Sequence, residues 1–365
     1  MTRVTIPRDL QEATPSWLTD ALRDAGAARG PAVTGYSAEA IAEGKGFMSQ
    51  LYRLRLDYDA DPGDLPRTVI LKLPSGDPLM RTLFNRLGQN QREVLFYQQA
   101  ISKGYLATPR SYYCGTNPAT GNTALLLEDL SDARQGDSVA GCTLAEAQLA
   151  IAQLARFHAA WWGSPRLDSL DWLPLKSAEA TVYEEIYRDS WRSFIGKASN
   201  GMPRNLQELG DRLGDDISAI KTRLSRSPQT VLHGDYRLDN CFFPTADGSP
   251  PFVVFDWEFC VRGRGAYDVA TFISEAFPTQ QRREEEMSLL RMYYDTLLEN
   301  GVGGYSFEEC LEDYRLAMLE IAVFWIVTGG YCEYEGERAT TYLHNSLARF
   351  DAAIADLGCA ELLAR

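Results

Sequence analysis

Apolar and polar positions along the first third of the chain predict a sheet-rich region. Residues 49–58 and 67–74 alternate or run apolar over strand lengths, and the turn-rich segment DADPGDLP separates them. The segments SYYCGT and TALLLEDL predict a hairpin around NPATGN. Helical spacing of apolar residues predicts an amphipathic helix over 9–29 and a second helix over 79–102.

The pattern becomes helical from about residue 143. Thr143, followed by Glu146 three residues later, is the signature of a capping box at a helix start. A strand pair around residues 231–255 interrupts the helical pattern. Further helices are predicted at 178–198, 205–225, 266–276, 279–299, 306–328 and 337–357.

These patterns predict an α+β protein with two lobes. A chain of 365 residues exceeds one ordinary core. We expect a small β-rich N-terminal lobe over residues 1–128 and a larger, mainly helical lobe over 129–365. A cleft between two such lobes is a common place for ligand binding.

Composition indicates a globular protein of the cytoplasm. Hydrophobic residues make up 45% of the chain and charged residues 24%. The start, MTRVTIPRDLQEA, lacks the apolar stretch of a secretory signal, and no apolar run is long enough to span a membrane. Seven cysteines are scattered and odd in number, which is typical of a reducing compartment.

The charge is unevenly distributed along the chain. Residues 1–128 carry 14 Lys and Arg against 13 Asp and Glu, a net charge of +1, whereas residues 129–365 carry 22 against 37, a net charge of −15. Such acidity argues against nucleic acid as a partner, because phosphate binding requires basic side chains. It favours a cationic ligand, or it serves solubility alone.

The N-terminal lobe offers candidates for phosphate binding. Gly44 and Gly46 precede a predicted strand, where backbone N–H groups could close on a phosphate, although two such glycines are also common in a plain turn. Lys72 lies within an apolar strand, where a buried ammonium needs a partner. Glu93, on the following predicted helix, is the expected partner. The alternative is that Lys72 reaches solvent from an edge strand.

The second lobe carries a constellation of oxygen-bearing side chains. In HGDYRLDN, Asp235 is followed by Asn240 five residues later, and Asp256 ends the apolar run in VVFDWE. This spacing is that of protein-kinase-like phosphoryl transfer. Magnesium prefers hard oxygen ligands, so Asn240 and Asp256 are its expected ligands. Asp235 would then accept the proton of the acceptor hydroxyl.

With these motifs in place, the sequence resembles the aminoglycoside phosphotransferase and choline kinase-like family of small-molecule kinases. It is similar in particular to the branch with ecdysteroid kinase-like proteins and phosphotransferases related to acyl-CoA dehydrogenases. HGD in place of HRD distinguishes it from protein kinases. The motifs are HGDYRLDN, FVVFDWE, VILKLP, REVLFY, LLLEDL and LARFHAAWW.

The resemblance implies further roles. Lys72, held by Glu93, would bind the α- and β-phosphates of ATP or GTP. The backbone around Glu128 and Leu130, in the hinge LLLEDL, would hydrogen-bond adenine. Asp268 would brace the catalytic loop from a following helix; the alternative is an ordinary helix N-cap. One departure is Ser49, which stands where the glycine-rich loop could have a third glycine.

Several residues keep two interpretations. Arg237, two residues after Asp235, corresponds to a position from which it could neutralise charge on the γ-phosphate, or it is a structural or surface arginine. His158 and His233 are expected to be structural. At least two of four tryptophans should pack in the core, and three glutamates should be solvated charge. These residues are Trp161, Trp162, Trp172 and Trp191, and Glu333, Glu335 and Glu337.

The predicted function is Mg²⁺-dependent transfer of the γ-phosphoryl group of ATP or GTP to a hydroxyl of a small molecule. The acid-rich lobe favours a cationic acceptor such as an aminoglycoside or amino alcohol. The aromatic helices and the family branch favour an apolar alcohol such as a sterol, macrolide or hydroxyacyl compound. The alternative function is a nucleotide-binding pseudokinase that acts as a scaffold.

Overall fold

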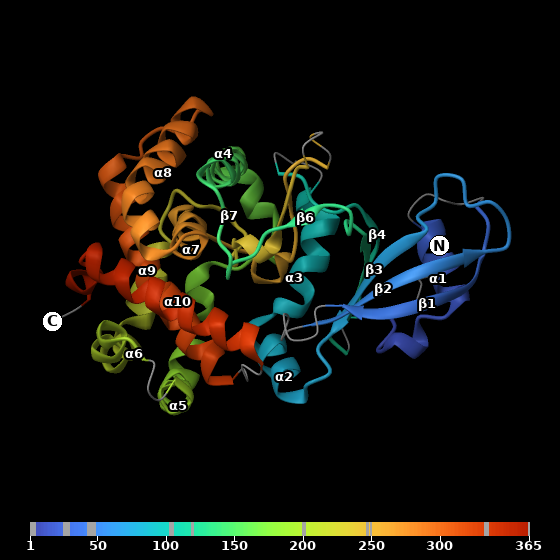
Figure 1. The fold of residues 1–365 in the computed structure, drawn as a ribbon, viewed down its shortest axis with the longest axis horizontal. Helices are drawn as coiled ribbons and strands as arrows, with labels where there is room; N and C mark the ends of the chain where they lie inside the picture. The colour runs from blue at the N-terminus through green and yellow to red at the C-terminus, as the bar shows by residue number, and fades with distance from the viewer. Residues whose placement is uncertain are drawn as a thin grey trace. The chain divides into compact units, whose positions relative to one another are not determined.

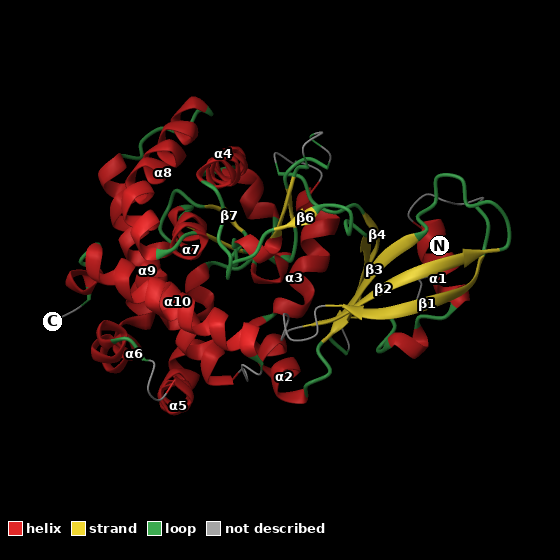
Figure 2. Ribbon diagram, viewed as in Figure 1, coloured by secondary structure: helices red, strands yellow, loops and turns green. Residues whose placement is uncertain are grey.

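The computed structural model describes residues 5–24, 30–41, 49–101, 106–117, 120–198, 202–245, 248, 250–331 and 336–363. The chain divides into two compact units. Unit 1 comprises Met1–Lys103 and Thr108–Ala133, and unit 2 comprises Gly104–Ala107 and Arg134–Arg365. Figure 1 shows the course of the chain, and Figure 2 shows that strands dominate unit 1 and helices dominate unit 2.

Unit 1 is built on a five-stranded antiparallel sheet with the strand order β1-β2-β3-β5-β4. The strands are β1 (Val33–Ile41), β2 (Ser49–Tyr58), β3 (Thr68–Pro74), β4 (Ser111–Asn117) and β5 (Asn122–Glu128). The predicted strands and the predicted hairpin are confirmed. The central position of β3 means that Lys72 does not lie on an edge strand.

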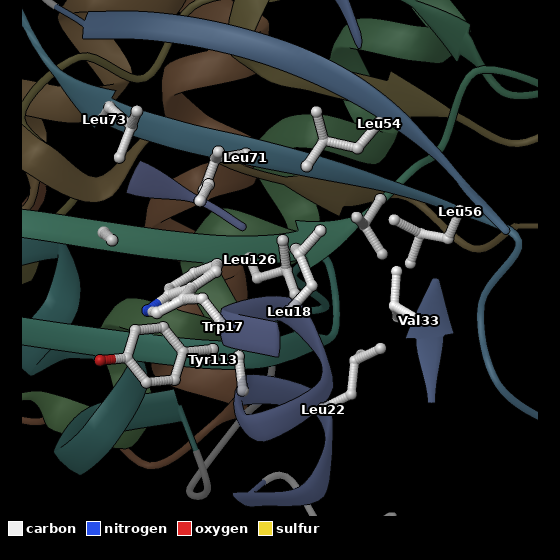
Figure 3. Close-up of a cluster of buried hydrophobic side chains, with 14 residues drawn as sticks. Trp17, Leu18, Leu22, Val33, Leu54, Leu56, Leu71, Leu73, Tyr113 and Leu126 are labelled. Atoms are coloured by element: carbon white, nitrogen blue, oxygen red, sulfur yellow. The ribbon is translucent and has the colours of Figure 1, made fainter. Parts of the chain in front are cut away.

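Helix α1 (Pro15–Asp24) covers one face of this sheet and completes a small core (Figure 3). Trp17 and Leu18 of the helix pack against Leu54, Leu71 and Leu126 of the sheet. Burying each such side chain contributes about 1.5–3 kcal/mol.

The first two predicted helices are shorter than the sequence pattern suggested. The segment 9–29 forms a single turn at Leu10–Glu12 and then α1, which begins at a proline. The segment 79–102 divides into α2 (Pro78–Leu87) and α3 (Gln89–Leu95), which continues as a wider helical turn over Phe96–Ala100. Gly88 separates α2 from α3 because its φ of 69° is incompatible with a continuous helix.

Unit 2 is mainly helical, and its helices follow the predicted ranges closely. The capping box of Thr143 and Glu146 is present at the start of α4. Helix α9 packs against α5, α6 and α7, and every residue of α7 is buried. The helices are α4 (Leu144–Trp161), α5 (Ala180–Ala198), α6 (Arg204–Leu224), α7 (Ala266–Ala276), α8 (Thr279–Glu299), α9 (Phe307–Tyr331) and α10 (Glu337–Asp356).

Short strands bring the polar motifs into unit 2, and here the prediction of one strand pair is wrong. Strand β7 (Thr230–Leu232) pairs with β10 (Val261–Gly263), whereas β9 (Val253–Val254) pairs with β8 (Cys241–Phe243), which also pairs with β6 (Arg134–Gln135). Asp235 and Asp256 therefore follow strands of two different small sheets. Strands of two or three residues are too short for hydrophobic periodicity to reveal their partners.

Candidate active site

The loop after β7 is held in an unusual conformation by its glycine. Gly234 has a φ of 86°, and a Cβ atom there would lie 2.1 Å from the carbonyl oxygen of Phe259. Only glycine fits both the backbone angle and this close approach. The loop can therefore turn sharply at the end of β7 and bring Asp235 and Asn240 onto one side.

Asp268, on the buried helix α7, fixes the start of this loop. Its carboxylate accepts hydrogen bonds from the backbone N–H groups of His233 (2.6 Å) and Gly234 (3.0 Å), and from Nε2 of His158 (3.2 Å). The Nδ1 atom of His158 lies 2.8 Å from the hydroxyl of Tyr293. Asp268 thus braces the loop, and it is not the N-cap of α7, which is Gly265. The structural interpretation of His158 is confirmed.

The ring of His233 ties the two motifs together. The backbone N–H of Asp235 donates to Nδ1 of His233 (3.2 Å), so Nδ1 acts as an acceptor. Its Nε2 lies 2.9 Å from the carbonyl oxygen of Phe255 and can donate to it. This arrangement requires the neutral tautomer with the proton on Nε2. The prediction that His233 braces the loop through its ring is confirmed.

Asp235 is oriented through one of its two carboxylate oxygens. Oδ2 accepts hydrogen bonds from Nδ2 of Asn240 (2.9 Å) and from Nε of Arg237 (3.0 Å). No described residue donates a hydrogen bond to Oδ1. The Asp235 side chain is 12% exposed. One oxygen is therefore fixed, and the other remains available to accept a proton from a ligand.

The amide group of Asn240 is oriented so that its oxygen is available to bind a metal ion. Its Nδ2 donates to both the backbone oxygen and Oδ2 of Asp235, and no described residue donates to its Oδ1. The backbone also connects Asn240 to the second motif, because the N–H of Phe255 donates to the Asn240 carbonyl (3.1 Å). An amide oxygen next to carboxylates is a donor set that fits Mg²⁺.

Asp256 adopts a strained backbone conformation. Its φ of 69° is the one positive φ at a non-glycine position in the described part of the chain. This left-handed conformation costs about 1–2 kcal/mol for an L-residue. Strain of this kind tends to persist where it directs a functional side chain.

Glu258 is a candidate that the sequence reasoning missed. It and Asp256 each offer a carboxylate oxygen within 4.8 Å of the other. Such a separation is compatible with two ligands of one cation or with ligands bridged by its water. The motif VVFDWE contained the signal, since the two acids lie two residues apart after a strand.

Arg237 lies in a network of acidic groups. Besides Asp235, its guanidinium contacts Oδ2 of Asp239 (3.2 Å) and the hydroxyl of Tyr342 on α10 (3.1 Å). Burial lowers the pKa of Arg237, but Asp235 and the other acidic neighbours outweigh this effect and raise the pKa well above its ordinary value. With a side chain 19% exposed, Arg237 is not a surface arginine.

Glu275 and Tyr342 complete this network, and sequence reasoning missed both. The Tyr342 hydroxyl donates to Oε2 of Glu275 (3.1 Å), on α7. Burial raises the pKa of Glu275 to about 7, against the opposing effect of Arg237. These two residues lie far from the loop in sequence, at helical positions with no motif to mark them.

In unit 1, Lys72 and Glu93 form the predicted ion pair. Nζ of Lys72 on β3 lies 2.6 Å from Oε2 of Glu93 on α3, and the side chains are 9% and 3% exposed. The pairing is confirmed, and the alternative of an edge-strand lysine reaching solvent is excluded. A buried ammonium held in this way is positioned for an anion, as phosphate binding by a lysine requires.

The other residues of unit 1 that the sequence predicted to bind the nucleotide are placed as follows. Gly44 and Gly46 lie outside the described residues. Ser49 is the first residue of β2 and pairs with Pro74. Glu128 ends β5, where its backbone N–H donates to the carbonyl oxygen of Arg110 (2.8 Å) and its carboxylate accepts from the backbone N–H of Arg110 (3.0 Å).

Leu130 follows two residues after the end of β5. Its carbonyl accepts a hydrogen bond from the N–H of Ala133 (2.9 Å). Since the N–H of Glu128 is engaged within unit 1, an adenine contact at this segment would need another backbone group.

The remaining candidates are structural or exposed. Trp161 and Trp191 are buried, so the expectation that at least two of the four tryptophans pack in the core is confirmed. Glu337 is exposed, as expected of solvated charge, and Glu333 and Glu335 lie outside the described residues.

Comparison with known proteins identifies the relatives of this chain. The model of the ecdysteroid kinase-like family matches residues 43–301. No curated protein matches the chain. In the described residues, no helix has the length and apolar character needed to cross a membrane.

Solved structures similar to this chain are small-molecule kinases. Choline kinase from Cryptosporidium parvum Iowa II has 12% identity and a TM-score of 0.56, covering 90% of this chain and 92% of its own. The GDP complex of aminoglycoside 2'-phosphotransferase-IIIa has 12% identity and a TM-score of 0.51, covering 96% and 99%.

A third structure is amicoumacin kinase in complex with AMP-PNP, Ca²⁺ and Ami. It has 13% identity and a TM-score of 0.50, covering 88% of both chains. At these identities the likeness establishes the protein-kinase-like fold of the small-molecule kinases, as the sequence predicted.

Proposed function

Because this chain belongs to the ecdysteroid kinase-like family, we propose that it is an ATP-dependent (or GTP-dependent) O-phosphotransferase acting on a hydroxyl of a small molecule. The observation that carries the proposal is the hydrogen bonding of the Asp235 carboxylate. One of its oxygens is held by Asn240 and Arg237, and no described residue donates to the other.

In the proposed reaction, Asp235 is the general base. The acceptor hydroxyl donates its hydrogen bond to Oδ1 of Asp235, and its proton passes to that oxygen as the hydroxyl oxygen bonds to the γ-phosphorus. The bond between the γ-phosphorus and the oxygen that bridges to the β-phosphate breaks, and the nucleoside diphosphate leaves with that electron pair. General-base assistance of this kind contributes about 10²- to 10⁴-fold.

Asn240 and Asp256 are the proposed Mg²⁺ ligands, with Glu258 as a third candidate. The amide oxygen of Asn240 and the carboxylates of Asp256 and Glu258 suit a hard divalent cation. When bound, the ion would neutralise charge on the phosphates. The residues themselves supply the orientation, since Asn240 is fixed through Asp235 and Asp256 through its left-handed backbone.

Residues of unit 1 are proposed to bind the nucleotide. Lys72, held by Glu93, would contact the α- and β-phosphates. Gly44, Gly46 and Ser49 would contribute backbone N–H groups to the phosphates. The backbone near Glu128 and Leu130 would hydrogen-bond the base.

Arg237 is proposed to act through Asp235. Its Nε donates to the same carboxylate oxygen that Asn240 holds, so it orients the base. The additional role of neutralising charge on the transferred phosphoryl group stays a prediction. Its other guanidinium contacts, to Asp239 and Tyr342, would have to loosen for that role.

A screen of chemically diverse alcohols with ATP and Mg²⁺ tests the proposal. The panel includes aminoglycosides, amino alcohols, sterols, macrolides and hydroxyacyl compounds, with phosphorylated product detected by mass spectrometry. We expect Asp235→Asn to lower turnover by about 10²- to 10⁴-fold while the affinity for ATP changes little.

The matched control is Asp295→Asn, which makes the same chemical change at an exposed position of α8. Turnover by the Asp235 variant at the rate of the control would remove Asp235 from the role of base. Nucleotide binding without turnover across the whole panel would favour the pseudokinase scaffold.

A further inference from the structure

The guanidinium of Arg237 lies where three acidic side chains converge. Asp235 and Asp239 come from its own loop and contact it at 3.0 and 3.2 Å. Glu275, on α7, joins through Tyr342, whose hydroxyl contacts both Arg237 (3.1 Å) and Glu275 (3.1 Å). The loop and α10 therefore bring oxygen atoms into contact with one guanidinium, and α7 adds an acidic group behind Tyr342.

An aromatic surface completes this environment. The Arg237 guanidinium carbon lies 5.6 Å from the centroid of the Tyr342 ring, and the Trp325 ring packs against Tyr342 with a centroid separation of 5.4 Å. Carboxylates combined with aromatic rings are the chemistry by which proteins recognise organic cations. The surroundings of Arg237 thus resemble a binding site for such a cation, and the protein fills it with its own side chain.

The surrounding charges are matched within the protein. Arg338, on α10, pairs with Asp137 at 3.0 Å and approaches Asp239 at 3.6 Å, while Arg349 donates to the backbone oxygen of Glu275 at 2.5 Å. A second cation next to Asp235 would meet Arg237 at short range, and like charges in a partly buried site repel strongly. The acidic groups next to Asp235 therefore already face a cation that belongs to the protein.

We propose that Arg237 is a specificity-determining residue: it acts as a built-in cation beside the base and excludes acceptors that carry a positive charge near the reacting hydroxyl. This inference rests on the proposed function, which places the acceptor hydroxyl at Asp235. It selects against amino alcohols and aminoglycosides that present an ammonium group there. Removing the Arg237 side chain converts its position into a site for a small organic cation.

Binding of two probes of the same shape tests this proposal without nucleotide or turnover. Choline carries a quaternary ammonium, and 3,3-dimethyl-1-butanol is its uncharged analogue. Their affinities are measured by isothermal titration calorimetry and thermal shift, at constant ionic strength, for the wild-type protein, Arg237→Ala and Arg237→Gln. The glutamine variant is shorter and uncharged but keeps hydrogen-bond donors, so it serves where the alanine variant does not fold.

We expect the variants to bind choline at least about ten-fold more tightly than the wild-type protein, which corresponds to about 1.4 kcal/mol. They should also prefer choline to 3,3-dimethyl-1-butanol by a similar factor. Adding Asp239→Asn to either variant should reduce this gain, because the Asp239 carboxylate contacts the Arg237 guanidinium directly.

The matched control is Arg338→Ala, which removes one positive charge from the same network without contacting Asp235. It should gain no affinity for choline. Equal choline affinity in the wild-type protein and the Arg237 variants would overturn the proposal, as would variants that do not distinguish choline from its uncharged analogue. Because the binding measurements need neither ATP nor turnover, their result does not depend on whether the kinase assay succeeds.

Discussion

Unit 2 contains two buried clusters of acidic and basic side chains, and they differ in what they leave available. In the cluster around the loop after β7, Oδ1 of Asp235 accepts no hydrogen bond from a described residue, and the side chain is 12% exposed. The second cluster joins Lys176, Lys221 and Glu320, whose side chains are at most 5% exposed.

The second cluster is sealed from ligands: Oε2 of Glu320 has no hydrogen-bond partner among the described residues, but it is fully buried. Glu320 Oε1 lies 2.6 Å from Nζ of Lys221 and 3.2 Å from Nζ of Lys176. The two ammonium groups also lie over the rings of Tyr183 and Tyr267, at 3.8 and 3.6 Å from the centroids. Burial raises the pKa of Glu320, but the two lysines outweigh it and lower the pKa to about 2.

The two clusters show that buried charges can serve either a reaction or the stability of the fold. A cluster that keeps one polar atom accessible can act on a ligand, whereas a sealed cluster can only hold its own elements together. Burial of charge alone is therefore no sign of function. Substitutions at Asp235 and Asp256 should change activity more than stability, and those in the second cluster should change stability.

Asp256→Gly should have the largest effect. Loss of the carboxylate removes a proposed metal ligand, so we expect Mg²⁺-dependent turnover to fall by about 10³-fold or more. Glycine accepts the φ of 69° without strain, so the free energy of unfolding should stay equal or rise by about 1 kcal/mol. Turnover and denaturant unfolding are measured on the same preparation. Retained turnover would place the metal elsewhere.

Glu320→Gln should have the opposite effect, lowering stability rather than turnover. Two buried lysines lose their shared carboxylate, and breaking a buried ion pair on one side costs about 3–5 kcal/mol. Urea unfolding measures the loss. Glu312→Gln is the control, since Glu312 pairs with Arg223 at the surface and should cost under about 1 kcal/mol. Equal losses in the two variants would contradict a structural role for the sealed cluster.

Glu275→Gln should change how the free energy of unfolding depends on pH. The pKa of Glu275 in the folded protein is raised from 4.5 to about 7, so its contribution to stability is complete below pH 4.5 and is lost as the pH rises through 7. Glutamine does not ionise. The stability of the variant relative to wild type should therefore rise between pH 5 and pH 8, by about 3 kcal/mol at most. Parallel stability curves for the two proteins over this range would show that the pKa is not raised.

Thr143→Ala gives a reference value for the loss of stability at a site outside both clusters. The Thr143 hydroxyl accepts a hydrogen bond from the Glu146 N–H at the start of α4, and losing such a cap costs about 1 kcal/mol. Thermal and urea unfolding should show this loss with unchanged nucleotide binding. A loss as large as that of Glu320→Gln would mean that the comparison reflects general fragility of unit 2.

The sequence predicted most of the fold because long segments carry strong periodicity. Helices α4 to α10 and the strands of unit 1 follow apolar patterns over seven residues or more. Strands β7 to β10 have two or three residues, and their pairing depends on tertiary contacts that no local pattern records. Gly88 divides a predicted helix through a backbone angle that composition alone does not reveal.

The candidate site was predictable where its residues are adjacent in sequence. Asp235, Asn240 and Asp256 belong to recognisable motifs, and Lys72 was conspicuous as a charge in an apolar strand. Glu275 and Tyr342 could not be identified from the sequence, because each occupies an ordinary helical position. Only the folded structure brings them next to Arg237. Lys221 was missed because a lysine on an amphipathic helix is usually solvated, and Lys176 because it lies in the short helical turn Lys176–Glu179, which has no periodic pattern.

The bracing by Asp268 has a consequence for redesign of the protein. One carboxylate on α7 sets the position of two successive peptide groups, and Asp235 follows directly after them. Engineers who wish to widen the acceptor range should therefore leave α7 untouched and vary α10, whose Tyr342 contacts the loop through Arg237. Libraries that diversify α7 would also displace Asp235, the proposed base.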